Sequence, residues 1–398
     1  TLSEAMVVLA AEDGGAEKAE QLLAMIDEIL CLMSVVGLRY AGIGRDALMA
    51  IYGDGLLPVF RIALSDGAQF DAAVERLEAK APEKMPTASL RGKEYRYFDL
   101  DDMRVIVATF KNDAVITVVP ASLSEDRLAR TLGLSKPRNS LAKTKDLRKL
   151  SNQYGYTDHF VSFIDVERIA ASFTGDPSGL NTEFLQIIEH DPAKFSAQCR
   201  SEFSSLAGIA PRIVAGYTGV SSRFLDSGVI VELREDIAAG LATLPAAVPG
   251  LGPDLGGLMA FGFSLDPLAL RSFYEDRLDA MEAEPFKCEA LADLQASTVK
   301  GREALAQPLP PVVYSFRGFL ANITNVEGMD VATQTPPESI DASLLFAMEN
   351  AQALVSMGAM MSPEIAALNL IPDGKAKLLN LPQLAEIAEQ AFAALSEN

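Results

Sequence analysis

The sequence predicts an α+β protein of two lobes, in which antiparallel sheets built from repeated ββα-type units carry flanking helices. Short apolar runs rich in β-branched residues alternate with turn signals and with segments of helical periodicity. The connections between these runs are too short for parallel crossovers. Because 398 residues exceed the size of one hydrophobic core, we place an N-terminal lobe at residues 1–208 and a C-terminal lobe at residues 209–398.

The first ββα unit follows an N-terminal helical region. Residues 4–36 have an interrupted helical periodicity, which predicts two helices. Residues 47–66 predict two strands around a glycine turn, and a helix at residues 67–80 follows with Ser65 or Asp66 as its N-cap. This strand, strand and helix order is the repeating unit that we expect elsewhere in the chain.

The remaining elements continue this pattern. Further strands are predicted at residues 89–100, 103–110, 114–121, 159–166, 212–220 and 223–233. Further helices are predicted at residues 124–132, 140–152, 165–173, 181–190, 192–207, 235–244, 341–360 and 382–395. Residues 245–257 and 307–311 are rich in Pro and predict loops. The ββα order recurs over residues 211–244, which suggests a weak internal duplication.

Charge and hydropathy exclude several classes of function. The net charge of -20 would repel a phosphate backbone, and no run of Lys or Arg reverses it locally, so we expect no nucleic-acid partner. No stretch approaches the 18 uncharged apolar residues of a transmembrane helix. The chain begins at Thr1, from which we expect either removal of a targeting segment or trimming.

The three cysteines lie in different contexts. Cys31 sits in an apolar run and is interpreted as a buried small hydrophobe. Cys199 and Cys288 lie in polar segments beside helices, so they either form one disulfide in an oxidising compartment or are two unrelated thiols. No CxxC is present and the only histidines are His159 and His190, so we expect no metal site.

No motif indicates a catalytic or cofactor site. The phosphate-binding patterns GxxxxGK[ST] and GxGxxG are absent, and we expect no cofactor. Ser140 and Lys143 match SxxK, but the companion elements of penicillin-binding enzymes are missing, and Ser140 is interpreted as an N-cap. Asp165 and Asp266 are also interpreted as N-caps. The acidic residues Asp99, Asp101 and Asp102 are interpreted as a solvated hairpin turn.

One segment favours a binding role. The predicted helix at residues 341–360 is rich in methionine, a flexible apolar residue that suits adaptable contact surfaces. Its helical spacing favours a core helix, with a groove or a partner-facing stripe as the alternative. The methionines concerned are Met348, Met357, Met360 and Met361.

Several segments resemble a family of uncharacterised exported bacterial proteins defined by a domain of unknown function. The resemblance lies in GLLPVFRIALSD, SLRGKEYRYFDL, NQYGYTDHFVSFIDVERIA, PRIVAGYTGV, CRSEF and PFKCEAL, and it covers about residues 40–330. It implies a periplasmic or lipoprotein-like, outer-envelope location, and it supports pairing Cys199 with Cys288. The chain carries neither the signal nor the lipid-attachment cysteine of that family. The resemblance supplies no catalytic residues.

The resulting expectation is a non-enzymatic cell-envelope protein that binds a protein partner or a small ligand. The first alternative is a hydrolase with a carboxylate- or serine-based site, which requires a cleft converging on groups such as Asp165, His159 or Ser140. The second alternative is a structural or assembly subunit, which a large exposed apolar patch would favour.

Overall fold

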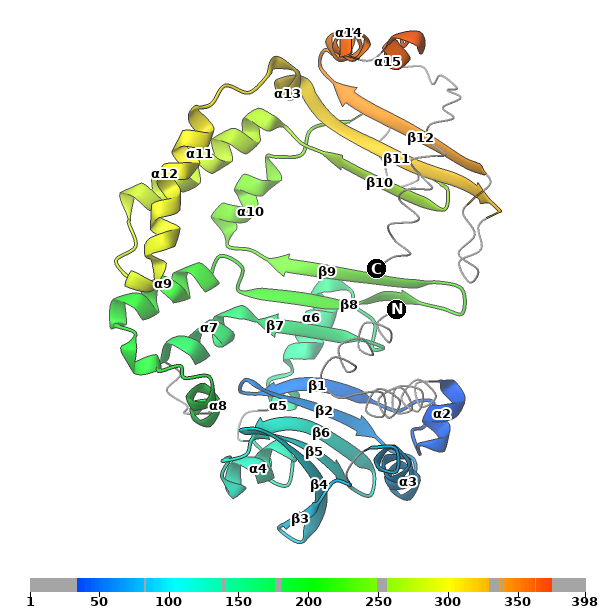
Figure 1. Ribbon diagram of the computed structural model, residues 1–398, viewed down its shortest axis with the longest axis vertical. Coiled ribbons are helices and arrows are strands. Elements are labelled where there is room, and N and C mark those ends of the chain that lie inside the picture. Colours follow the sequence, from blue (N-terminus) through cyan, green and yellow to red (C-terminus); the bar gives the residue numbers. More distant parts are fainter. Residues whose placement is uncertain are drawn as a thin grey trace, which may run out of the picture. The chain divides into compact units, whose positions relative to one another are not determined.

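The computed structural model describes residues 34–81, 84–137, 140–175, 180–248, 256–328, 337, 339–361 and 363–373. The fold is α+β, as predicted, and the strands of these residues form three antiparallel sheets (Figure 1). The chain divides into two compact units, residues 1–233 and residues 234–398. The division lies after the residue 208 expected from the sequence, because β8 (Arg212–Val220) pairs with β7 (Val161–Asp165) in the first unit.

A six-stranded sheet with the order β1-β2-β6-β5-β4-β3 dominates the first unit. Its strands are β1 (Met49–Asp54), β2 (Leu57–Ala63), β3 (Thr87–Leu90), β4 (Lys93–Leu100), β5 (Met103–Thr109) and β6 (Asp113–Pro120). Two helices, α3 (Gly67–Glu78) and α4 (Glu125–Thr131), follow the hairpins. Asp66 caps α3 by accepting hydrogen bonds from the amides of Ala68 and Gln69, which confirms one of the two predicted N-caps.

Alternate side chains of this sheet enter two different cores. Val59 and Ile106 pack with Leu128 of α4, whereas Ile62 packs with Phe70 of α3. Because neighbouring residues of a strand point to opposite faces, each face is covered by one of the two helices. The predicted ββα unit is therefore the element that builds both cores.

A three-stranded sheet with the order β7-β8-β9 follows in the same unit. Here β9 (Leu225–Glu232) pairs with β8, and α6 (Asp146–Tyr154) contributes Leu150 to a core with Tyr156 and Val214. Gly216 allows the Tyr156 ring to approach, because a Cβ atom there would lie 2.4 Å from that ring. The other elements are α2 (Val35–Tyr40), α5 (Leu141–Thr144), α7 (Val166–Gly175), α8 (Thr182–Ile187), η1 (Pro192–Lys194) and α9 (Ala197–Ala207).

The second unit contains a sheet with the order β10-β11-β12 and a set of helices. Its strands are β10 (Met259–Ser264), β11 (Phe316–Glu327) and β12 (Ser339–Met348). Its helices are α10 (Glu235–Ala242), α11 (Pro267–Ala283), η2 (Glu289–Leu291), α12 (Ala292–Ala306), α13 (Pro311–Ser315), α14 (Ala351–Met361) and α15 (Pro363–Ala367). In Figure 1, α11 and α12 run side by side, drawn in yellow-green and yellow.

Three helix predictions are corrected by the structure. The helix expected at residues 192–207 is divided into η1 and α9, because Phe195 and Ser196 between them are extended. The helix expected at residues 341–360 is wrong in its first half, because residues up to Met348 form β12 and pair with β11. The helix expected at residues 140–152 is interrupted at Lys145, whose φ of 57° is left-handed. The helices expected before residue 34 and at residues 382–395 lie outside the described residues. Across the described part of the chain, no helix combines the length and the apolarity needed to cross a membrane.

Candidate functional site

The residues named for the hydrolase alternative are Ser140, His159 and Asp165. Among the described hydrogen bonds, none joins Ser140, His159 and Asp165 to one another. Asp165 instead accepts a hydrogen bond of 3.0 Å from the amide of Arg168, and it also forms an ion pair with that side chain. Asp266 caps α11 in the same way, so the capping interpretation of both aspartates is confirmed.

Two of the cysteines form a disulfide, and the acidic turn contains an aspartate paired with an arginine. Cys199 and Cys288 are disulfide-bonded, whereas Cys31 lies outside the described residues. Asp99 binds Arg104 through two hydrogen bonds of 2.6 and 3.0 Å, and this guanidinium lowers the pKa of the Asp99 carboxyl. Within the described ranges, no group of three or more His, Cys, Asp or Glu residues is arranged to hold a metal ion.

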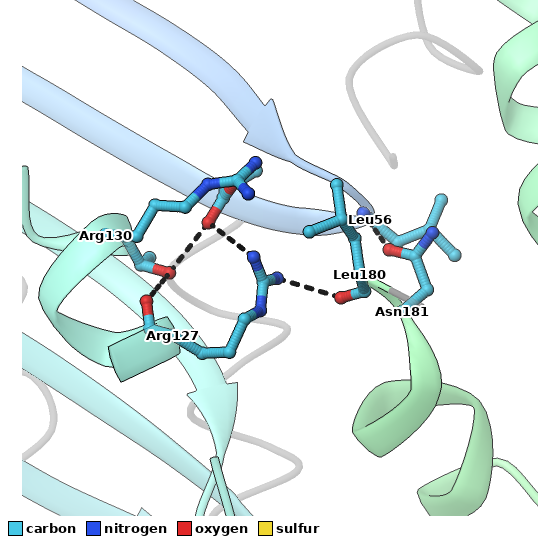
Figure 2. A network of polar contacts seen from close by, with 7 residues as sticks. Leu56, Arg127, Arg130, Leu180 and Asn181 are labelled. Atoms are coloured by element: carbon cyan, nitrogen blue, oxygen red, sulfur yellow. Dashed lines mark hydrogen bonds and ion pairs between the residues drawn. The ribbon is translucent and has the colours of Figure 1, made fainter. Parts of the chain in front are cut away.

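A buried polar network joins the six-stranded sheet to the segment before α8 (Figure 2). The Asp54 carboxylate accepts hydrogen bonds from Arg127 at 3.3 Å, Arg130 at 2.7 Å and the Thr131 hydroxyl at 3.0 Å. Arg127 also donates to the Leu180 carbonyl at 2.8 Å. The Asp54 carboxylate is thus shared by three donors, which is the arrangement of a structural ion-pair network.

The same region contains a turn that depends on glycine. The Leu56 amide donates to the Asn181 side-chain oxygen at 2.7 Å (Figure 2). Gly55 stands beside this contact with a φ of +70°, and a Cβ atom there would lie 2.3 Å from the same oxygen. The close approach and the left-handed backbone both require glycine at position 55.

The second unit contains an apolar cavity of about 580 Å³. It lies among α11, α12, α13, α14 and the ends of β11 and β12, and most of its walls are leucine, phenylalanine, methionine and valine side chains. The residues that line it are Leu265, Pro267, Leu270, Arg271, Tyr274, Ala304, Leu305, Leu309, Val313, Phe316, Phe346, Met348 and Leu354. Its size is that of a small-molecule site.

Only two lining side chains of this cavity carry strong polar groups. The Arg271 guanidinium donates to Glu275 at 3.0 Å and to the Leu305 carbonyl, so its charge is already countered. Tyr274, the second of them, lines the cavity and is itself exposed. An open, largely apolar cavity lined by one phenol and one neutralised cation favours an uncharged, largely apolar occupant.

An aromatic face of the sheet adjoins this cavity. Phe263, Phe319 and Phe346 lie opposite one another across β10, β11 and β12. The ring centroid of Phe319 lies 5.1 Å from that of Phe263 and 6.1 Å from that of Phe346. Phe261 extends the row at 5.6 Å from Phe319. Phe261 is 62% exposed and Phe346 is 58% exposed, which is unusual for large apolar side chains. Phe346 belongs to both the aromatic face and the cavity wall.

A second pocket, of about 380 Å³, lies in the first unit and is polar. It is formed by the end of α7, by α8 and by the turn that leads into η1. His190 lies in its wall, packed between Phe173 and Phe195 at ring-centroid distances of 5.6 Å each. In the sequence, His190 was noted only as one of two histidines in the argument against a metal site, and the pocket was not foreseen.

The methionine-rich segment is divided between two roles. Met348 lies at the end of β12 in the cavity wall, whereas Met360 on α14 is exposed. The prediction of one core helix is therefore wrong for Met348.

No protein-family model, no curated protein and no solved structure matches the chain significantly, so the resemblance to the exported family stays a prediction.

Proposed function

We propose that the protein is a non-enzymatic binding protein of the cell envelope, and that the cavity of residues 234–398 holds an uncharged ligand with an alkyl chain. The single observation that carries the proposal is the apolar cavity of about 580 Å³. Binding sites for small molecules measure about 300–1,000 Å³ and combine apolar walls with a few polar groups. The disulfide of Cys199 and Cys288 supports an oxidising compartment.

The aromatic face explains why the ligand would carry a chain. Phe346 is shared by the cavity and the face, so an apolar surface continues from the cavity along the exposed phenylalanines. An extended chain that leaves the cavity would cover Phe263 and Phe319 and would remove their surfaces from water. Each Å² of apolar surface covered in this way stabilises the complex by about 25 cal/mol. Because Arg271 is already paired with Glu275, a charged head group has no free partner in the described wall of the cavity.

Dye displacement tests the proposal. The uncharged dye Nile red should bind saturably, and 1-dodecanol should displace it. The variant Ala304→Trp fills the cavity and should weaken binding of both molecules. The matched control is Ala306→Trp on the same helix, because Ala306 does not line the cavity and residues two apart point in different directions.

The outcomes separate the proposed function from its alternatives. Equal weakening by both tryptophan variants, or no saturable dye binding by the wild-type chain, would refute the cavity proposal. Concentration-dependent dimerisation that Phe261→Ser abolishes would instead favour the assembly subunit, since the exposed aromatic face is the patch that this alternative requires.

A further inference from the structure

His190 has one ring nitrogen engaged and one free of protein partners. Its Nε2 lies 2.6 Å from the carbonyl oxygen of Phe173, and a carbonyl only accepts, so Nε2 carries the proton. Among the described residues, Nδ1 has no hydrogen-bond partner. In the neutral ring Nδ1 is therefore an acceptor, and the packing of Phe173 and Phe195 on the ring fixes its orientation.

The charged residues that line the polar pocket have one sign. They are Glu189 and Asp191, and no Lys or Arg is among the lining residues. One Asp191 oxygen accepts from the amide of Ala193 at 2.9 Å, while the Glu189 carboxylate has no partner among the described residues. Three consecutive residues thus line one pocket, and two of them carry a carboxylate.

The backbone holds these acceptors in place. Glu189 has a φ of 54°, a left-handed conformation that is uncommon for any residue except glycine. The turn is closed by the His190 amide, which donates to the Leu185 carbonyl at 2.8 Å, so Glu189 and Asp191 flank His190 in the chain on a short, hydrogen-bonded segment. A ligand that binds here must donate hydrogen bonds and benefit from negative charge.

We propose that the polar pocket around His190 binds a primary ammonium group, through Nδ1 of His190 and the carboxylates of Glu189 and Asp191. A primary ammonium group has three N–H donors and no acceptor, which matches three acceptors. Its positive charge offsets the cost of placing two carboxylates in one pocket. This site is independent of the apolar cavity, because it lies within the first unit.

Nitrogen-15 NMR of the full-length oxidised protein tests the proposal, since the chain has only two histidines. Near pH 8 an ordinary imidazole is neutral and an alkylamine is charged. The spectrum should assign the Nε2–H tautomer to His190, and butylammonium should shift its Nδ1 resonance saturably. The neutral analogue 1-butanol should not produce that shift. The variant His159→Phe identifies the His190 signals and should bind butylammonium with unchanged affinity.

Two variants complete the test. His190→Phe keeps a ring between its aromatic neighbours and should abolish binding measured by calorimetry, whereas Glu189→Gln keeps the side-chain size and should weaken it about tenfold or more. Should His190→Phe fail to fold, Glu189→Gln and the wild-type titration still decide. An Nδ1–H tautomer, an equal response to 1-butanol, or unchanged affinity of Glu189→Gln would overturn the proposal.

Discussion

Replacing Asp54 by asparagine removes the one negative charge shared by the network of Figure 2. The Asp54 side chain is only 9% exposed, and its partners Arg127 and Arg130 are 16% and 32% exposed. The substitution keeps the side-chain size but leaves two guanidinium groups without a counter-charge. The Thr131 hydroxyl can still donate a hydrogen bond in the asparagine variant, because it also reaches the Arg127 carbonyl at 3.1 Å.

The expected loss follows from the burial of these partners. Breaking a fully buried ion pair by removing one partner costs about 3–5 kcal/mol. Arg130 is about one-third exposed and water can solvate it, and Arg127 keeps the Leu180 carbonyl, so the expected loss is shifted below this range. We expect Asp54→Asn to reduce the free energy of unfolding by about 2–4 kcal/mol. Asp126→Asn is the control, because Asp126 is 92% exposed in its pair with Arg91 and should change stability by less than about 1 kcal/mol.

Urea unfolding followed by circular dichroism measures both variants, because the chain contains no tryptophan for fluorescence. Hydrogen exchange of the β2 and β6 amides then reports the first unit alone, which matters in a chain with two compact units. Equal stability of Asp54→Asn and Asp126→Asn would refute the reasoning. So would a loss confined to amides of residues 234–398, because the network lies wholly within the first unit.

Three further predictions concern a glycine, an aspartate and the disulfide. Gly55→Ala should destabilise the first unit by about 2–5 kcal/mol through clash and strain, whereas Gly92→Ala, with positive φ but open space, should cost only about 1–2 kcal/mol in the same urea assay. Two arginines lower the pKa of Asp236 in the folded protein. The ionised carboxylate therefore stabilises the fold at a pH above its unfolded pKa, and this contribution is lost as the pH falls through the folded pKa. The amount by which Asp236→Asn lowers the Tm should accordingly become smaller below about pH 4. Reducing the disulfide of Cys199 and Cys288 should lower the free energy of unfolding by about 4 kcal/mol in the chain-entropy model, and an unchanged urea midpoint would contradict this.

Local patterns predicted most of the hairpins because their signals are local, but the single strand expected at residues 89–100 is wrong, since the chain turns there between β3 and β4. The turn between β1 and β2 and the N-cap of α3 were both read correctly, since glycine and aspartate act through the adjacent backbone. The segment DASLLFAM was misassigned because its apolar run suits a helix or a buried strand equally. Pairing of β12 with β11 decides between them, and that contact lies outside the window in which periodicity is read.

The two pockets were beyond the reach of sequence patterns for a related reason. The apolar cavity combines side chains from Leu265 to Leu354, and each of them is chemically indistinguishable from a core residue. Phe261 and Phe346 alternate along their strands as inward-facing residues do, yet Phe261 is 62% exposed and Phe346 is 58% exposed. Apolar alternation predicts which residues share a face, and whether that face is a core or a binding surface depends on what covers it.

His190 shows the same limit for a polar residue. In the sequence it is a lone histidine with no partner of the kind that a relay or a metal site requires. Its chemistry arises when α7 supplies the Phe173 carbonyl to Nε2 and the following turn places a carboxylate on either side of it in the chain. A backbone carbonyl is present at every position and leaves no signature, so the tautomer that makes Nδ1 an acceptor is a property of the fold alone.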